Sequence, residues 1–500
     1  MKSLEENGKL ILVTGATGYI VCRLVPRLLE AGYRVRCLVR DPNRLQGRPW
    51  LDKVEISRGD VLSEESLVTA MQGVDVAYYL IHGMQGGKVN AERDMQAARN
   101  FACATDSVNV EQIIYLGELV DRNATLSPYL RARHETGYLL RQGGVPVTEL
   151  RAGIVIGSGS LLFEMIRYVT EHQPIMVCPR WWYTLAQPIA IRNVLDYLLA
   201  VLDTPASHGK LIEIGGLDQL SYAQMCKGYA ELRGFKRLMI PAPVYAPRLS
   251  AWWVHMLTPL HWRALLPLIE GLNARSIVQD DSARHIFPDI QLLDYKTAVS
   301  RALGRVLNDD VETTWADALV SSAGDNQPYT FSLQDGMMIE DRRKLVTISA
   351  KCVFKAFTGL GGSRGWLYLD WTWDIRGWLD KIMGGVGIRR GRRHPDELYV
   401  GDSLDFWRVE AVEPNRLLRL RAEMKSPGKA WLQFQSIPQP DGKTLLTQTA
   451  YFAPRGLTGF LYWYSLYPIH LFLFSGMINR IAERAAQLED MENNIAIITN

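Results

Sequence analysis

The feature that most constrains this chain is a glycine turn between an apolar run and a helical stretch near the N-terminus. Leu10–Val13 is apolar, Thr14-Gly15-Ala-Thr-Gly18 forms the turn, and Tyr19–Ala31 has helical periodicity. Gly15 permits a tight turn, and Gly18 lets backbone N–H groups approach a diphosphate, whose charge is favoured at a helix N-terminus. A strand, turn and helix in this order predict a dinucleotide site. The alternative is a glycine turn that binds no ligand.

The residues up to about 155 alternate between apolar runs and helical stretches. Further strands are predicted over Arg34–Val39, Val54–Ile56, Asp75–Leu80, Gln112–Leu116 and Val147–Arg151, with helices over 64–71, 92–104 and 129–141. Such alternation forms βαβ units and hence a parallel sheet covered on both faces. We therefore predict a Rossmann-type, doubly wound α/β domain over residues 1–305, in which the more helical part from about 158 to 305 caps a pocket.

The residues at the end of the second predicted strand indicate whether the cofactor is NADP or NAD. That strand runs into Arg40, followed by Asp41 and, three residues later, Arg44. An arginine suits the 2′-phosphate of NADP, whereas a carboxylate would bind the ribose 2′-hydroxyl of NAD. Arg40 therefore favours NADP(H), Asp41 keeps NAD(H) open, and the alternative for Arg40 is a solvated surface charge. Val21 occupies the third position of the glycine pattern, where a small residue is usual, so its side chain must push the helix outward or fill a gap.

Several short motifs resemble known families. Thr14–Ile20, Leu38–Pro42 and Gly59–Val61 resemble the atypical short-chain dehydrogenases of the NmrA-like and extended kinds. More narrowly, the chain resembles bacterial two-domain proteins that carry domain of unknown function 2867, on these segments: Tyr79–His82, Arg133–Glu135, Glu149–Ala152, Ile154–Gly159, Gly401–Asp402 and Phe406–Trp407. The resemblance implies a C-terminal domain similar to the START/polyketide-cyclase, or helix-grip, fold.

The resemblance also implies a set of cofactor-binding residues. Asp60 and Val61 would lie beside the adenine, and Leu80–His82 would line the cofactor after the fourth strand, although His82 alone is more typical of a polar loop. The full predicted set is Gly15, Ala16, Thr17, Gly18, Tyr19, Ile20, Arg40, Asp60, Val61, Leu80, Ile81, His82 and Arg133.

A catalytic apparatus is only partly present. Short-chain dehydrogenases use Ser, Tyr and Lys, the last two four residues apart on a helix, and the Lys lowers the pKa of the Tyr. Tyr129 and Arg133 have this spacing, but Arg replaces Lys, and Gly117 followed by Glu118 stands where the Ser is expected. Tyr129 and Arg133 are the candidate catalytic pair, and Glu118 is a second acid/base candidate. The alternative is that Tyr129 packs at the helix start and Arg133 contacts the cofactor or a carboxylate.

Composition excludes some classes of function. The net charge of +3 is not the marked excess of basic residues that nucleic-acid binding needs. The six cysteines lack any C-x-x-C pair, so neither a zinc site nor a disulfide framework is indicated. The polar start, Met1–Lys9, lacks the apolar stretch of a secretory signal. These features favour a reducing, cytoplasmic compartment.

The sequence pattern changes from helical to strand-like after a polar stretch. We predict a linker over 306–328 and an α+β helix-grip domain over 329–500. Strands are predicted over Arg343–Ser349, Gly365–Trp373, Asp402–Val412, Leu417–Met424, Lys429–Ser436 and Lys443–Phe452, with a hairpin turn at Pro440–Gly442. An apolar helix closes the domain, and the seven tryptophans of this half are expected in its core. Such a fold encloses an apolar cavity suited to a hydrophobic ligand.

The closing segment raises the question of a membrane. Residues 457–479 contain no Asp, Glu, Lys or Arg and are long enough to cross a bilayer, but Pro468, His470 and Asn479 favour a helix buried against protein. The basic cluster Arg389–His394 is expected to be a solvated loop, although an anionic lipid surface would attract it.

Three hypotheses follow from these features. The first is an NADP(H)-dependent oxidoreductase acting on a hydrophobic carbonyl or alcohol. The second is a non-catalytic NADP(H)-binding sensor, or a ligand-binding protein with a lipid-like ligand in its C-terminal domain. The third, less favoured, is a membrane-surface protein that uses residues 457–479 as an anchor.

Overall fold

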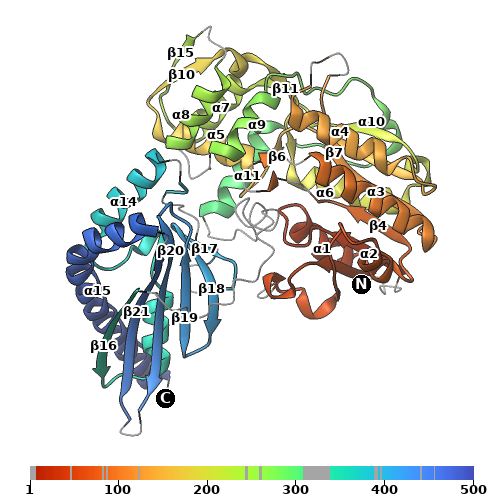
Figure 1. Cartoon of the computed structure of the whole chain (residues 1–500). Coiled ribbons are helices and arrows are strands. Elements are labelled where there is room, and N and C mark those ends of the chain that lie inside the picture. Colours follow the sequence, from red (N-terminus) through yellow and green to blue (C-terminus); the bar gives the residue numbers. More distant parts are fainter. Residues whose placement is uncertain are drawn as a thin grey trace. The chain divides into compact units, whose positions relative to one another are not determined.

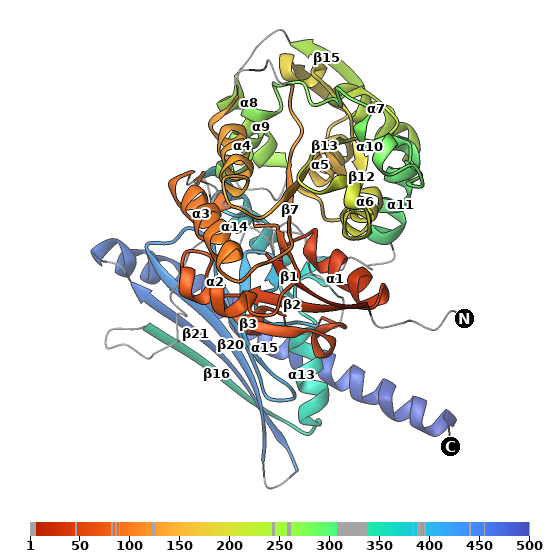
Figure 2. The ribbon, with the colours of Figure 1, turned by 90° about the vertical axis from the view of Figure 1, so that its right-hand side faces the viewer.

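The chain forms two compact units, Met1–Gly324 and Asp325–Asn500, which Figures 1 and 2 show from two sides. The computed structural model describes residues 7–45, 48–81, 84–85, 88–89, 91–121, 124, 126–242, 246–257, 262–307, 338–383, 385–387, 392, 394, 397–439, 442–454 and 456–499. The division between the units falls in the stretch expected to be a linker, of which residues 308–328 lie outside the described part.

A seven-stranded parallel sheet organises the first unit. Its strands are β1 (Asn7–Thr14), β2 (Tyr33–Val39), β3 (Glu55–Arg58), β4 (Val76–Tyr79), β7 (Gln112–Glu118), β8 (Val147–Ala152) and β13 (Leu211–Ile214). They lie in the order β3-β2-β1-β4-β7-β8-β13, and every neighbouring pair is parallel. The order of the strands reverses between β1 and β4, and ligands of such sheets bind at the carboxyl ends of the strands at this point. The predicted doubly wound sheet is confirmed.

Helices cover both faces of this sheet. One face carries α1 (Val21–Glu30) and α6 (Ile191–Ala200), and the other carries α2 (Glu64–Met71), α3 (Ala91–Ser107) and α4 (Pro128–Leu140). Neighbouring residues of a strand point to opposite faces, so Ile11 and Val13 of β1 join the core under α1 and α6, while Leu12 joins the core under α2 and α3. Each face of the sheet therefore packs against its own hydrophobic core.

A mainly helical part follows, built around a third core. Its main helices are α5 (Leu161–His172), α7 (Tyr222–Leu232), α8 (Pro247–Leu257), α9 (Trp262–Gly271), α10 (Ser282–Ile286) and α11 (Tyr295–Leu307). Its short strands are β9 (Val155–Ile156), β10 (Ile175–Pro179), β11 (Leu185–Ala186), β12 (Ile189–Ala190), β14 (Leu220–Ser221) and β15 (Leu238–Ala242). Trp181 packs edge-on against Trp182 and Tyr222 at ring-centroid distances of 5.9 and 5.6 Å. An aromatic core of this kind gives the cap its own rigid centre.

The second unit is an antiparallel sheet with a long closing helix. Its strands are β16 (Met338–Val346), β17 (Ser403–Leu404), β18 (Trp407–Glu413), β19 (Leu417–Ala422), β20 (Gly428–Pro438) and β21 (Thr444–Pro454), and its helices are α13 (Ala350–Thr358), α14 (Asp370–Ile382) and α15 (Gly456–Thr499). The sheet order is β16-β21-β20-β19-β18-β17. The predicted hairpin is present, because Pro438 pairs with Thr444, although residues 440–441 of its turn lie outside the described part.

One predicted strand of this unit is wrong. Gly365–Trp373 was expected to be a strand, but helix α14 begins at Asp370. The alternation of Trp371 and Trp373 imitates a strand over a few residues, whereas the apolar residues from Trp371 to Ile382 recur at helical spacing. The three tryptophans of α14 also differ in exposure: Trp373 is buried, while Trp371 and Trp378 are 60% and 57% exposed. Not all of the tryptophans therefore lie in the core.

The apolar segment 457–479 forms the first half of α15. One side of it is buried, with Trp463, Phe474 and Met477 in the core of the unit, and Phe452 of β21 stacks on Trp463. The other side is exposed, and Phe472 has 75% of its surface accessible. Among the described residues, no helix combines the length and the apolar character needed to cross a membrane.

Candidate active site

The glycine turn is held against the neighbouring strand β4. Gly15 adopts φ +76°, and a Cβ atom placed on it would lie 2.7 Å from the backbone oxygen of Leu80. Thr14 Oγ1 donates to the Tyr78 carbonyl at 2.9 Å and accepts from the Leu80 N–H at 3.1 Å, while the Gly18 N–H donates to the Gly15 carbonyl at 2.7 Å. The close approach of two backbones explains why glycine is required at position 15.

The start of α1 presents unpaired backbone N–H groups. Ile20 at the N-cap makes no side-chain capping bond, and no acidic residue lies in the first turn. The N–H groups of Thr17, Ile20 and Val21 meet no acceptor in the part of the chain that the structure describes. Because such groups carry the positive end of the helix dipole, this turn fits a diphosphate. The residues present therefore fit the predicted dinucleotide.

Two side chains of the turn region pack against neighbouring protein groups. Val21 is 1% exposed and lies in the core under α1, so the helix accommodates it in interior space. Tyr19 extends toward Gly157, where an added Cβ would meet its hydroxyl at 2.4 Å. The Arg23 guanidinium lies 4.1 Å from the centre of the Tyr19 ring and donates to the Ser158 carbonyl at 3.1 Å. Tyr19 thus positions the turn.

A cationic group lies where β2 ends. Arg40 is half-buried, and burial lowers the pKa of its guanidinium, an effect that Asp60 opposes and Arg93 reinforces. Arg93, from the first turn of α3, approaches Asp60 with Nη2 at 4.0 Å from Oδ2. Two guanidinium groups therefore share one carboxylate beside the end of the second strand. Sequence reasoning missed Arg93, because its place next to Arg40 depends on how α3 packs on the sheet.

The remaining predicted cofactor residues lie along the same edge. Asp60 Oδ1 accepts from the Leu62 N–H at 3.1 Å, and the Asn100 amide donates to the Val61 carbonyl at 3.3 Å. Leu80 is buried, and Ile81 follows it directly after β4. His82 lies outside the described residues. Apart from His82, the predicted cofactor residues follow the carboxyl ends of the strands or, in the case of Arg133, contact them from α4.

Tyr129 and Glu118 form a hydrogen-bonded pair at the end of β7. The Tyr129 hydroxyl donates to Glu118 Oε1 at 3.0 Å. Tyr129 sits at this position because Pro128 starts α4 and Ser127 caps it, with the Ser127 hydroxyl accepting from the Leu130 N–H at 3.3 Å. Ser127 is therefore occupied as a helix cap. The Glu118 carboxylate at the end of β7 therefore faces the phenol, next to Gly117, where the resemblance predicts a serine.

Arg133 ties the ends of β4 and β7 together. Its Nη2 donates to the Leu116 carbonyl at 2.8 Å and its Nη1 to the Ile81 carbonyl at 3.5 Å, while the guanidinium lies 5.5 Å from the centre of the Tyr115 ring. Its Nε is buried and meets no partner in the described part of the chain. A buried donor without an acceptor is costly, so Arg133 Nε fits a site that a bound group completes.

Burial and neighbouring charges shift the pKa values of this cluster. Burial raises the pKa of Tyr129 well above its ordinary value and Glu118 raises it further, whereas Arg133 lowers it. The effect expected of Arg133 therefore exists but is outweighed. Burial also raises the pKa of Glu118, against the lowering effects of Arg133 and of the bond from Tyr129. Burial disfavours the charge on Arg133, but Tyr115, Tyr129, Glu118 and Asp94 together raise its pKa.

The cap brings an apolar lining close to this cluster. Tyr222 lies near enough to Glu118 for the carboxylate to contribute to the raised pKa of its phenol, after the larger effect of burial. Tyr222 also lines a cavity of about 10 Å³ with Trp181, Trp182 and Cys226. Gly271 at the end of α9 packs on Leu130 of α4. Tyr222 could not be assigned from the sequence because it follows Glu118 by more than a hundred residues.

Comparisons with known proteins agree with this geometry. Residues 15–159 match the family model described as NAD(P)H-binding, and residues 333–477 match the protein of unknown function family DUF2867. The chain is 30% identical over 115 residues to 3-beta-hydroxysteroid dehydrogenase of Mycolicibacterium neoaurum, which is 21% of this chain and 31% of that protein. It is 29% identical over 122 residues to cinnamoyl-CoA reductase 2 of Arabidopsis thaliana, or 23% and 36% of the two chains. The matches thus span about a third of these relatives.

Solved structures of low identity cover the first unit. Triphenylmethane reductase of Citrobacter sp., complexed with NADP(H), is 18% identical and covers 58% of this chain and 99% of its own, with a TM-score of 0.49. The matches of family models carry the assignment. The first unit therefore contains a segment that matches the NAD(P)H-binding family model, and the second contains one that matches the DUF2867 model.

Proposed function

We propose that the chain is an NADP(H)-dependent oxidoreductase that interconverts a hydrophobic carbonyl compound and its alcohol. The observation that carries the proposal is the Tyr129–Glu118 pair, whose atoms lie 3.0 Å apart at the carboxyl edge of the sheet. The glycine turn, Arg40 and Arg133 border the same edge. A proton donor beside a nicotinamide site is what carbonyl reduction requires.

The chemistry divides between cofactor and protein. When bound, the reduced nicotinamide supplies a hydride to the carbonyl carbon. Tyr129 would donate its hydroxyl proton to the carbonyl oxygen. Glu118 in its protonated form, at hydrogen-bond distance from the Tyr129 oxygen, would then give its carboxyl proton to Tyr129 and become a carboxylate. Burial raises the pKa of both groups, which favours their protonated forms. Arg133 stabilises the negative charge that Tyr129 acquires in this step.

A preference for NADP(H) over NAD(H) is supported by Arg40 and Arg93 around Asp60. We expect Arg40→Gln to weaken NADPH binding about 10- to 100-fold, since hydrogen bonds to charged groups contribute about 1.5–3 kcal/mol. NADH binding should change less than about threefold. Tryptophan fluorescence titration measures both dissociation constants.

Arg34→Gln is the matched control for this prediction. Arg34 lies at the opposite end of β2, paired with Glu55 at 2.7 Å, and its side chain is 63% exposed. Its loss removes the same charge without touching the site. If the two variants bind NADPH equally well, Arg40 does not read the 2′-phosphate.

A hydrophobic substrate is supported by the lining of the cap. Tyr222 lies close to Glu118, so the apolar part of a substrate would contact the Tyr222 ring while its carbonyl faces Tyr129. The cavity of about 10 Å³ beside Tyr222 is too small to hold the substrate itself. The direct test is a panel of aromatic and aliphatic ketones and aldehydes, followed by the absorbance of reduced nicotinamide. Saturable NADPH oxidation by an apolar member supports the proposal, and no oxidation across the panel contradicts it.

The role of Glu118 predicts a pH dependence. Its carboxyl group has a pKa raised above the ordinary value of 4.5, so its proton is available below that raised value and is lost as the pH rises through it. We expect kcat/KM for carbonyl reduction to fall on this alkaline limb in the wild type. In Glu118→Gln the limb should be absent and kcat should fall about 10²-fold or more. A limb that persists in the variant assigns the titration to another group.

A second candidate function is a non-catalytic NADP(H) sensor. The observation in its favour is Gly117 at the position of the family serine, next to a Tyr129 hydroxyl already occupied by Glu118. A sensor would bind NADPH and change its melting temperature without oxidising it in the presence of any carbonyl. The same panel, run with a thermal-shift measurement, separates the two functions.

For the second unit we propose a helix-grip fold of the START kind with a lipid-like ligand. The proposal is supported by the chain order, in which the first strand β16 pairs with the last strand β21 and the sheet then runs back to β17, while helices follow β16 and close the domain. Extraction of the purified chain and mass spectrometry of the extract test for a bound lipid.

A further inference from the structure

Helix α14 exposes an apolar face that the fold of its unit leaves uncovered. Its exposed large apolar residues are Trp371, Ile375, Trp378, Leu379, Ile382 and Met383. They recur at three- and four-residue steps and so form one stripe along the helix. The opposite side is anchored, because the Asp380 carboxylate is fully buried and accepts from the Gly387 and Lys425 N–H groups at 2.9 and 2.7 Å.

The first half of α15 exposes a second face of the same kind. Its exposed large apolar residues are Leu461, Tyr464, Tyr467, Ile469, Leu471 and Phe472. No charged residue occurs between positions 456 and 479. A helix surface that faces water is rarely made of Tyr, Phe and Leu without any charged residue. Exposed apolar patches of this size mark interaction sites.

Two contacts link the segments that carry these faces. Arg376 Nη2 of α14 donates to the Tyr462 hydroxyl of α15 at 3.0 Å, and a Cβ on Gly476 of α15 would lie 2.1 Å from the ring of Tyr368, two residues before α14. The start of α15 therefore contacts α14 at Arg376, and Gly476 of α15 packs against Tyr368, which precedes α14. We call the exposed apolar residues of the two helices together the α14/α15 face.

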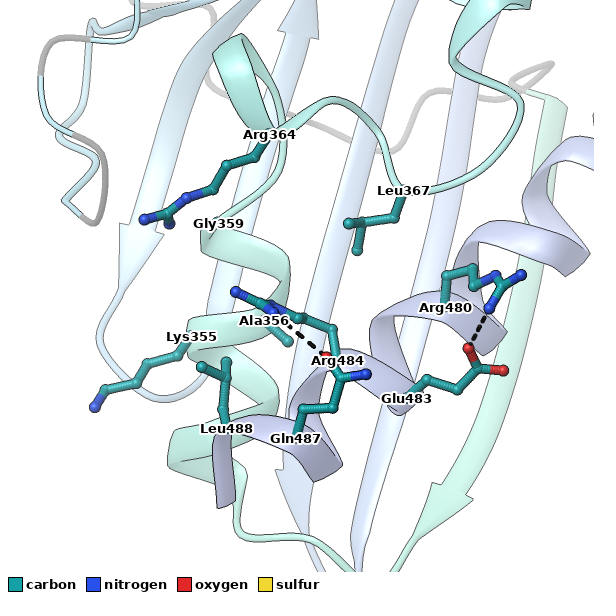
Figure 3. Close-up of a pocket in the computed structure, with 10 residues that line it drawn as sticks. All are labelled: Lys355, Ala356, Gly359, Arg364, Leu367, Arg480, Glu483, Arg484, Gln487 and Leu488. Atoms are coloured by element: carbon teal, nitrogen blue, oxygen red, sulfur yellow. Dashed lines mark hydrogen bonds and ion pairs between the residues drawn. The ribbon is translucent and has the colours of Figure 1, made fainter. Parts of the chain in front are cut away.

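A cationic groove lies at the edge of this face. Its volume is about 860 Å³, and its lining contains Arg364, Arg480 and Arg484 around Leu367 and Leu488. Figure 3 shows Arg364 and Arg480 on opposite sides of Leu367, and Leu367 directly precedes Tyr368, which contacts α15. The groove thus begins where the α14/α15 face ends.

The groove has more positive than negative charge. Among the lining residues that the structure describes, Glu483 is the one acidic residue and pairs with Arg480 at 2.7 Å. Lys355, also in this lining, pairs with Glu492. Arg484 hydrogen-bonds to the neutral Gln487 at 3.3 Å, and no carboxylate of the described residues forms an ion pair with it. This groove therefore complements an anion.

We propose that the α14/α15 face docks onto the surface of an anionic lipid bilayer, with the phosphate of a lipid headgroup bound in the groove at Arg364, Arg480 and Arg484. Tryptophan and tyrosine favour the interface between headgroups and acyl chains, and apolar helix faces lie there parallel to the membrane plane. Cations beside such a face attract anionic headgroups. A surface-bound second unit would also supply the first unit with hydrophobic substrates from the membrane.

Co-sedimentation of the full chain with lipid vesicles tests whether the apolar residues of the α14/α15 face bind the membrane. The wild type should bind vesicles of phosphatidylglycerol and phosphatidylcholine. Trp378→Ser combined with Phe472→Ser should lower the partition coefficient at least about tenfold for each aromatic residue removed, since burial of such a side chain stabilises by that order. Both residues are more than half exposed, so the variant should fold, which circular dichroism checks. Trp252→Ser, an exposed tryptophan of the first unit, is the matched control and should bind like the wild type.

The groove is tested with charge variants. Arg484→Gln should weaken binding to the anionic vesicles about fivefold, whereas Arg416→Gln, which removes an exposed arginine paired with Glu413 in the same unit, should not. Binding to pure phosphatidylcholine should be weaker than to anionic vesicles for the wild type and unchanged by Arg484→Gln. Equal binding to both vesicle types overturns the headgroup site.

Two further results would overturn the proposal. The first is a wild type that stays in the supernatant at every vesicle concentration. The second is a wild-type dimer, seen by sedimentation velocity, that dissociates in the Trp378→Ser, Phe472→Ser variant without any vesicle binding, because a second copy would then cover the α14/α15 face.

Discussion

Tyr129→Phe is expected to lower kcat for NADPH-dependent carbonyl reduction by about 10²- to 10⁴-fold, the range that general acid catalysis contributes. The substitution removes the only proton that Tyr129 can donate and keeps the aromatic ring. The measurement is steady-state turnover on the carbonyl compound of the panel that gives the highest rate. The dissociation constant for NADPH should change less than about twofold, because the hydroxyl faces Glu118 and not the glycine turn.

Tyr138→Phe on the same helix is the matched control. Tyr138 is 57% exposed, and its loss of a hydroxyl should leave kcat unchanged. The Tyr129 variant loses one hydrogen bond to a buried carboxyl group, which costs about 1–3 kcal/mol, so its melting temperature must be measured beside its activity. A stable variant with a kcat within about threefold of the wild type would remove Tyr129 from the mechanism.

Local sequence signals were sufficient for the backbone around the predicted cofactor turn, because β1, Gly15 and α1 follow one another as predicted. An apolar run, a glycine turn and a helix in this order predict a strand, a tight turn and a helix start whose free N–H groups suit a diphosphate. The end of β2 was equally readable, since Arg40 directly follows the last strand residue. Each of these inferences depends on residues that are close neighbours along the chain.

The proton-transfer half depended on tertiary packing and was only partly predictable. Helical spacing placed Tyr129 and Arg133 on one face. It could not show that the Tyr129 hydroxyl would donate a hydrogen bond to Glu118. Nor could it show that burial raises the pKa of Tyr129 more than Arg133 lowers it. Arg93 reaches Asp60 from a helix that follows more than thirty residues later in the chain. Interactions between such distant segments leave no local pattern.

The second unit shows a different limit of sequence reasoning. Strand alternation was read correctly for β19, β20 and β21, which pair over long registers, but Trp371 and Trp373 imitated that pattern at the start of α14. The usual expectation that tryptophan is buried failed for Trp371 and Trp378 for the same reason, since a helix divides its residues between an inner and an outer face. Which side of α14 faces inward is decided by buried Asp380 and its backbone partners.

Gly15→Ala is expected to weaken NADPH binding by about 100-fold, equivalent to about 2.7 kcal/mol. The new Cβ would stand 2.7 Å from the Leu80 carbonyl oxygen, so the turn must move away from β4. The N–H groups of Thr17, Ile20 and Val21 then no longer converge on one point, and the charge of the diphosphate loses its partners. Isothermal titration calorimetry with NADPH measures the effect.

Gly73→Ala separates this displacement from backbone strain. Gly73 has φ +71°, close to the +76° of Gly15, but no atom lies within 4 Å of its added Cβ. Both variants therefore bear a similar cost for a left-handed residue, about 1–2 kcal/mol, and only Gly15→Ala adds a collision with another strand. Equal losses of stability with equal NADPH affinity in the two variants would show that the turn does not bind the diphosphate. An affinity lost in Gly15→Ala alone would assign the binding to the contact between the end of β1 and the end of β4.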